Sequence, residues 1–161
     1  MATPLAFTAG YTHSIDAVRA AYSDEQYWKA RIAEVGGPSA RLDSLTVDGD
    51  QVRIQLVQSI PADQLPPAIT AVRPGDLVIP RVEHYTGTSG TFEAHVDGAP
   101  ATVRGTVTLT PTATGCEGAV TGTIEVKIPL FGGKIEAAIA ERLTELLTNE
   151  ATFTEQWLAT K

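Results

Sequence analysis

Three side chains that could take part in chemistry alternate along one apolar segment in the middle of the chain. Arg81, Glu83 and Tyr85 lie in the segment 77–86, where polar and apolar residues recur with the period of two that is typical of a β-strand. This alternation places the three on one face, together with Ile79. Buried charges are costly unless they are paired, so on an inward face Arg81 and Glu83 are expected to pair. Such a group could hold the polar end of an apolar ligand, or supply an acid and a base to an enzyme.

The opposite placement of this strand is the alternative. An offset of one residue would turn Val78, Val82 and His84 inward and leave the charged residues on the other face. Arg81 and Glu83 would then form only a structural ion pair at the edge of the sheet. Alternation within one strand does not choose between the two placements.

Other reactive residue types in the sequence do not form a recognisable site. Cys116 has no histidine on its expected face, which indicates an inert buried thiol. His84 and His95, with Glu93 opposite His84, could bind a metal, but solvated cross-strand residues are the better explanation, because metal ligands normally cluster more tightly. The glycines before Lys134 lack the rest of a phosphate-binding motif. We therefore expect no catalytic residue, no metal site and no cofactor.

The element that must organise the fold is a long helix near the end of the chain. Apolar residues recur with helical spacing from Lys134 to about Ala159, beginning at Ile135, Ile139 and Leu143. A helix of about 26 residues is roughly 39 Å long. Its apolar stripe therefore needs a large partner surface, which the preceding strands must provide.

The rest of the sequence predicts seven strands and two short helices. Alternation and turn signals give strands at about 5–11, 42–47, 51–60, 77–86, 91–97, 101–110 and 115–128. Two short helices fill residues 14–35 and are joined through Ser23, the expected cap of the second. The proline-rich residues 61–76 are expected to form a surface excursion with at most one helical turn.

Side chains alternate between the two faces of a strand, and each hairpin passes this alternation to the next strand. This predicts one sheet face that is apolar. If Tyr85 pairs with Phe92, the residues Ala94, Val103, Val107, Val120 and Ile124 lie on the face of Arg81 and Glu83. Gly105, Gly118 and Gly122 share that face and permit strong curvature. The predicted fold is α+β and forms a single domain over residues 1–161. In it, a curved seven-stranded antiparallel sheet is wrapped around the long C-terminal helix, and the two short helices lie between strands 1 and 2.

Three segments carry a resemblance to a known family. The residues from Ile128 through Pro-Leu-Phe-Gly-Gly-Lys-Ile to Glu136, the pair Leu65-Pro66, and the ending from Glu150 to Leu158 are similar to those of an uncharacterised bacterial family. That family is within the START-like, or helix-grip, superfamily, which the element order of the whole chain also resembles. The resemblance implies a cavity between sheet and helix that holds an apolar ligand. The expected lining residues are Ile54, Leu56, Ile79, Arg81, Glu83, Tyr85, Phe92, Ala94, Val103, Ile135, Ile139 and Leu143.

These observations predict a protein that binds a hydrophobic small molecule or lipid, as a carrier or sensor. One alternative is an enzyme of the polyketide cyclase or dehydrase type that uses Arg81, Glu83 and Tyr85, as the superfamily also implies. A third interpretation is a chaperone-like module that binds other proteins through its surface. The net charge of −7 argues against nucleic acid or an anionic membrane as a partner, and no apolar run is long enough for stable membrane insertion. One cysteine and no apparent signal peptide predict a cytoplasmic protein. A homodimer is possible.

Overall fold

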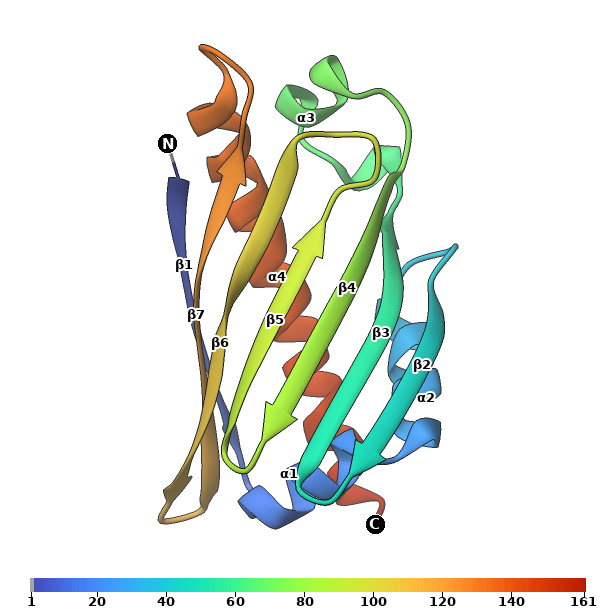
Figure 1. The fold of residues 1–161 in the computed structure, drawn as a ribbon, viewed down its shortest axis with the longest axis vertical. Helices are drawn as coiled ribbons and strands as arrows, with labels where there is room; N and C mark the ends of the chain where they lie inside the picture. Colours follow the sequence, from blue (N-terminus) through green and yellow to red (C-terminus); the bar gives the residue numbers. More distant parts are fainter. Residues whose placement is uncertain (1) are drawn as a thin grey trace.

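The computed structural model describes residues 2–161 and confirms the predicted helix-grip arrangement, with one seven-stranded antiparallel sheet on one side of a long helix (Figure 1). The strands are β1 (Ala2–Tyr11), β2 (Arg41–Asp48), β3 (Gln51–Ile60), β4 (Leu77–Thr86), β5 (Ser89–His95), β6 (Ala101–Thr112) and β7 (Gly115–Val126). Their order across the sheet is β1-β7-β6-β5-β4-β3-β2. Only the pairing of β1 with β7 joins strands that are distant in the sequence.

The strand parity predicted from the hairpins is confirmed, although the register of one hairpin is wrong. Tyr85 lies opposite Gly90, not Phe92, and Glu83 lies opposite Phe92. The turn after β4 is tighter than expected, because Thr86 already pairs with Ser89. The error is two residues, which is one full period of a strand, so every side chain keeps its predicted face.

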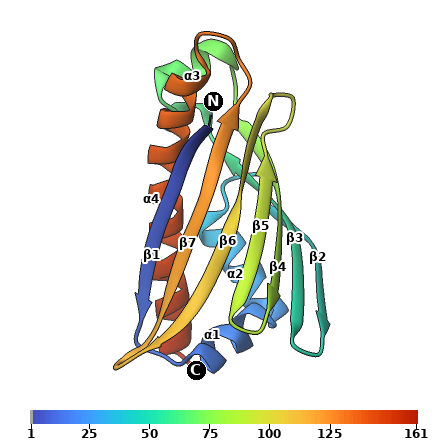
Figure 2. The same cartoon turned by 60° about the vertical axis from the view of Figure 1, so that its left-hand side comes forward.

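The long helix α4 (Gly132–Ala159) packs on the concave face of the sheet (Figure 2). Glu136, whose side chain is fully buried, ties the start of the helix to β1 and β7. Its carboxylate accepts hydrogen bonds from Val126 N, at 2.9 Å, and from Thr3 Oγ1, at 2.8 Å, and these lower the pKa of Glu136. A Cβ atom at Gly132 would lie 2.5 Å from the Val126 carbonyl oxygen, so the close approach requires glycine. Gly132, the first residue of α4, therefore has a structural role at the bend between β7 and the helix.

Two short helices pack on the same side of the sheet as α4. They are α1 (Ile15–Tyr22) and α2 (Glu25–Val35). Ser14 caps α1. Asp24, and not the predicted Ser23, caps α2, because its carboxylate accepts a hydrogen bond from Gln26 N at 2.9 Å. The fully buried Trp28 of α2 donates from its indole nitrogen to the Tyr22 carbonyl, which joins the two helices.

The sequence predicted that the proline-rich excursion would lie on the surface, but part of it is buried. It contains a short 3-10 helix, η1 (Ala62–Gln64), and one further helix, α3 (Pro67–Val72). Leu65 and Ile69 are buried against Ile60, Leu77 and other core residues at the end of the sheet. The prediction failed because the prolines mark chain breaks but give no information about which side chains fold back. The excursion therefore covers one end of the space between sheet and α4.

Candidate functional site

A cavity of about 110 Å³ lies between the concave sheet face and α4. Strands β1 and β3–β7, the excursion and α4 all contribute to its wall. Most of the lining residues predicted from the sequence do line it, namely Ile79, Arg81, Glu83, Tyr85, Phe92, Ala94, Val103, Ile139 and Leu143. Phe7, Val107, Val120, Leu146 and Leu147 extend the same apolar wall.

Three predicted lining residues lie elsewhere in the core. Ile54 and Leu56 belong to a packed cluster with Trp28 and Ile32, because α2 covers this part of β3. Ile135 packs beneath the excursion, one turn of helix away from the cavity-lining Ile139. Sheet parity placed the strand residues on the correct face, but it does not show which helix covers each part of that face.

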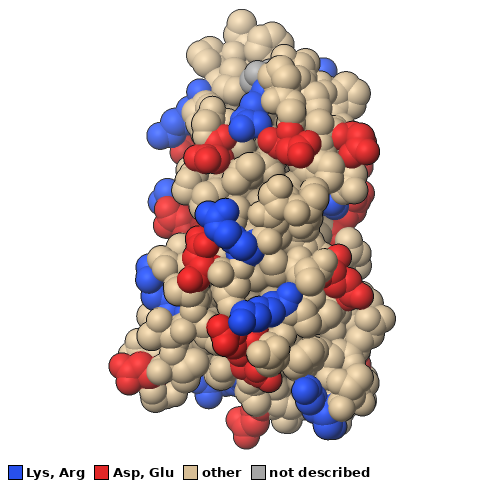
Figure 3. Space-filling model, turned by 90° about the vertical axis from the view of Figure 1, so that its right-hand side faces the viewer, with Lys and Arg blue, Asp and Glu red and all other residues tan. Residues whose placement is uncertain are grey.

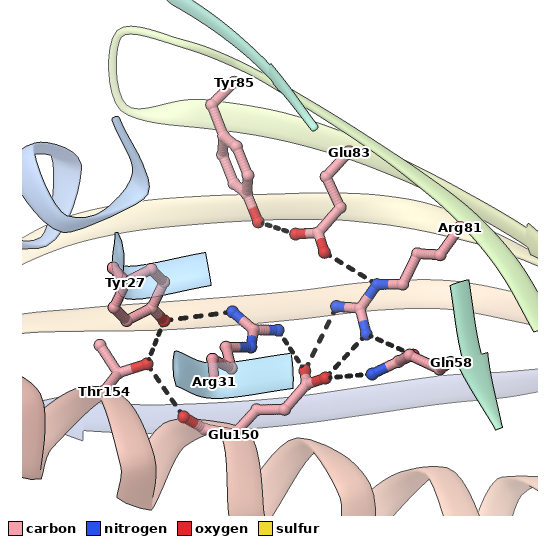
Figure 4. Close-up of polar contacts among 8 residues, drawn as sticks. All are labelled: Tyr27, Arg31, Gln58, Arg81, Glu83, Tyr85, Glu150 and Thr154. Atoms are coloured by element: carbon pink, nitrogen blue, oxygen red, sulfur yellow. Dashed lines mark hydrogen bonds and ion pairs between the residues drawn. The ribbon is translucent and has the colours of Figure 1, made fainter. Parts of the chain in front are cut away.

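A buried polar cluster forms part of the cavity wall, and Glu150 of α4 lies at its centre (Figure 4). Its carboxylate contacts Arg31 of α2 at 2.6 Å and Arg81 of β4 at 2.9 Å. The Gln58 side chain donates to the same carboxylate at 2.8 Å. Both residues are buried: Glu150 is 4% exposed and Arg31 is 5% exposed. One carboxylate thus holds two guanidinium groups from different elements inside the protein.

The second carboxylate of the cluster is Glu83, whose residue is 1% exposed. Tyr85 donates its hydroxyl to Glu83 Oε1, and Arg81 Nε lies 2.8 Å from Glu83 Oε2. The contact with Arg81 is an ion pair that is not aligned as a hydrogen bond, so these two atoms have no hydrogen-bond partner among the described residues. Arg81, Glu83 and Tyr85 therefore face inward, and the alternative strand offset is wrong.

The cluster controls the protonation of its members. Burial alone would raise the pKa of Glu150, but the charges of Arg31 and Arg81 outweigh it and lower the pKa to about 2. Burial, together with the Glu83 charge, raises the pKa of Tyr85 well above its ordinary value. Glu150 is therefore ionised at neutral pH, whereas Tyr85 keeps the proton that it donates to Glu83.

Several members of this cluster were missed in the sequence. Arg31, Gln58 and Glu150 meet Arg81 only in the folded chain, and Tyr27 and Thr154 extend the cluster through a 2.6 Å contact of their hydroxyl groups. One usable signal exists: Glu150 follows Leu143, Leu146 and Leu147 on the apolar stripe of α4. A charged residue on such a stripe indicates a buried partner of opposite charge.

Cys116 and His84 are two other reactive residues singled out in the sequence. Cys116 is 1% exposed, as its predicted inward position requires. His84 contacts Gln51 Oε1 at 3.3 Å and lies opposite Thr91 rather than the predicted Glu93. Within residues 2–161, no three His, Cys, Asp or Glu side chains are grouped as metal ligands would be.

Comparison with known proteins places the chain in a family. The family described as "Protein of unknown function (DUF2505)" matches residues 6–158. The uncharacterized protein Rv0481c of Mycobacterium tuberculosis is 33% identical over 163 residues, which cover 94% of this chain and 94% of that protein.

Two solved structures are similar in fold. A START superfamily protein from Mycobacterium smegmatis has a TM-score of 0.58 at 15% identity, over 97% of this chain and 98% of that one. The di-domain ARO/CYC protein StfQ of the steffimycin biosynthetic pathway has a TM-score of 0.64 at 13% identity, over 99% of this chain and 51% of that one. At these identities the likeness shows the START-like fold and nothing of the ligand. From the family match over nearly its whole length, the chain belongs to the DUF2505 family of proteins of unknown function.

Proposed function

We propose that this protein binds a hydrophobic small molecule in the cavity between the sheet and α4, and acts as a carrier or sensor for it. The observation that carries the proposal is an apolar cavity with a polar group of residues in one part of its wall. Ligand pockets typically combine an apolar lining with a few converging polar groups that orient the ligand. Arg81, Glu83 and Tyr85 are the residues we assign to that orienting role. We place the protein in the cytoplasm, where its buried Cys116 would remain reduced.

The size of the cavity limits the ligand. The cavity measures about 110 Å³, whereas pockets for drug-sized ligands measure about 300–1,000 Å³. An engineered apolar cavity of about 150 Å³ accommodates benzene, so a compound with a single ring fits this protein with little adjustment. A longer ligand, such as a lipid chain, requires a larger cavity. The proposal therefore separates small ring compounds, which fit the cavity as it is, from lipids, which need it to widen.

Filling the cavity tests this proposal. Ala94 is buried on β5 and lines the cavity, so Ala94→Leu is expected to occupy part of the space and to lower ligand affinity at least tenfold. The same change is expected to raise the free energy of unfolding by about 0.5–2 kcal/mol, as cavity filling commonly does. Binding is measured by NMR titration with benzene, and copurifying compounds are identified by native mass spectrometry and organic extraction.

The matched control is Ala119→Leu, which makes the same change on the outer face of β7. Ala119 alternates with the inward-facing Gly118 and Val120 and does not line the cavity. The control is expected to bind benzene like the natural protein. Equal binding by the Ala94→Leu protein, or no binding by the natural protein, would contradict the proposal.

A second candidate function, an enzyme of the polyketide cyclase type, is supported by two observations. The ionisable residues Arg81 and Glu83 line the cavity, and the fold is similar to that of the ARO/CYC protein StfQ. In this reading Glu83 is the base, and Tyr85 positions its carboxylate through the hydrogen bond between them.

Glu83→Gln separates the two functions, because the amide keeps the shape of the side chain but cannot accept a proton. An enzyme is expected to lose turnover by about a hundredfold or more, while its substrate still binds. A carrier is expected to change its ligand affinity and has no turnover to lose. In either case the loss of the buried charge beside Arg81 is expected to lower the free energy of unfolding. Turnover of a linear polyketide mimic and its binding, measured on the same preparation, distinguish the outcomes, and Glu93→Gln on the outer face of β5 is the control.

A further inference from the structure

The connection between β7 and α4 departs from two local preferences of a stable chain. Leu130 has a φ of 71°, in the left-handed region that glycine and asparagine tolerate best. Its side chain is 98% exposed, so packing does not offset the strain. Phe131 occupies the N-cap position of α4, forms no side-chain capping bond and is 57% exposed. Ser, Thr, Asp or Asn would be preferred there. Stability therefore explains neither residue.

The surroundings of these two residues are cationic and apolar. Lys127 and Lys134 flank them, both exposed, and no acidic residue lies between the two lysines in the sequence. The Glu125 carboxylate is 3.8 Å from the Lys127 ammonium group, and both side chains are exposed to solvent. Ile128 and Ile135, on either side of the connection, share a small apolar hollow with Ile69 of α3.

The connection and α3 both lie at one end of the molecule (Figures 1 and 2). On the face drawn in Figure 3 the extreme upper end shows uncharged residues, with charged side chains below it. The two exposed apolar side chains thus belong to the end of the molecule that also carries α3. The apolar pair Leu130 and Phe131, with its two flanking lysines, is called the tip below.

We propose that the tip inserts into the surface of a lipid bilayer that contains anionic lipids. Leu130 and Phe131 would enter the boundary between head groups and acyl chains, where aromatic residues are enriched. Lys127 and Lys134 would bind lipid phosphates while their stems follow the apolar surface. A stable protein interface needs about 800 Å² from each partner, which two residues at the apex of a loop do not supply. A fluid apolar phase requires no such area.

The contact is shallow and reversible. Among residues 2–161, no helix is long and apolar enough to cross a membrane, so only the tip enters the bilayer. The net charge of −7 opposes a close approach to an anionic surface, and the two lysines offset it only locally. The inference goes beyond ligand binding and does not depend on what occupies the cavity. It would bring α3, which covers one end of the cavity, close to the lipid.

Vesicle sedimentation tests the tip without any ligand. The full chain is mixed with vesicles of equimolar phosphatidylcholine and phosphatidylglycerol, or of phosphatidylcholine alone. The natural protein is expected to bind both, and the anionic vesicles more tightly. The double variant Leu130→Asn, Phe131→Ser is expected to bind at least about tenfold more weakly, since it removes both apolar groups. Its unfolding midpoint is expected to stay equal or rise, because both new residues fit their backbone positions better.

Two further variants sharpen the result. Lys127→Gln and Lys134→Gln are each expected to weaken binding to anionic vesicles by about fivefold, with little effect on neutral ones. Val47→Thr is the matched control, because Val47 is 49% exposed on β2 at the opposite end of the molecule. It should bind like the natural protein.

Several results would overturn the proposal. They are failure of the natural protein to sediment with either vesicle, unchanged binding by a folded double variant, and equal losses in the Val47→Thr protein. Analytical ultracentrifugation distinguishes one further case. Tip-dependent dimers without vesicle binding would show that the tip contacts a second copy of the chain and not a membrane.

Discussion

Replacing Glu150 by glutamine is expected to destabilise the protein by about 3–5 kcal/mol, the range observed when one partner of a buried ion pair is removed. Glu150 contacts Arg31 at 2.6 Å and Arg81 at 2.9 Å. The variant leaves both guanidinium groups inside the protein, with Glu83 as the one remaining carboxylate of the cluster. The amide can accept hydrogen bonds but carries no charge to offset either group. Urea unfolding followed by tryptophan fluorescence measures the change.

The control for this prediction is Glu145→Gln on the same helix. Glu145 contacts Arg142 at 3.2 Å, and its side chain is 64% exposed, so its loss is expected to cost less than about 1 kcal/mol. A loss of similar size in both variants would show that burial is not the cause. A loss below about 1 kcal/mol for Glu150→Gln would show that water reaches the two arginines.

Acid is expected to destabilise the natural protein through the same carboxylate. The pKa of Glu150 is lowered from 4.5 to about 2 in the folded protein, because Arg31 and Arg81 outweigh the effect of burial. A lowered pKa means that the stabilisation is complete above pH 4.5 and is lost as the pH falls through 2. One pH unit of pKa difference corresponds to about 1.4 kcal/mol, so the free energy of unfolding should fall by about 3 kcal/mol across this window through Glu150.

Urea unfolding at a series of pH values between neutral and acid measures this dependence. The Glu150→Gln protein is the comparison, since it lacks the titrating group and should show a shallower acid limb over the same window. Other carboxylates contribute to both curves, Glu136 and Glu155 among them, because hydrogen bonds lower their pKa values too. The difference between the curves therefore isolates Glu150, and parallel curves would contradict the prediction.

The buried cluster around Glu150 and the exposed tip depart from the requirements of stability in opposite ways. The cluster around Glu150 places charges in the core, where apolar residues of the same size would often serve stability as well or better. The tip places apolar residues on the surface, in positions where polar residues would fit the backbone better. Each is a local departure from what stability favours, and such departures are expected at functional sites.

Much of the fold could be predicted because it depends on local periodicity. Alternation along β4 puts Arg81, Glu83 and Tyr85 on one face, and successive short hairpins carry this parity across the sheet to Val103 and Ile124. Even the wrong register between β4 and β5 left the faces intact, since it was an error of one full strand period. The length of α4 likewise followed from the spacing of its apolar residues.

The contents of the site were decided by tertiary structure. Arg31, Glu150 and Arg81 come from three elements that are distant in the sequence, and no local pattern indicates that one carboxylate will hold both guanidinium groups. The side chains of Ile54 and Leu56 lie on the predicted face of the sheet, but α2 covers them there, so they do not reach the cavity. The sequence by itself thus determined which side of each element is apolar, because that depends on neighbouring residues. Which elements meet across the core depends on long-range packing, and this alone produced the buried cluster and the cavity beside it.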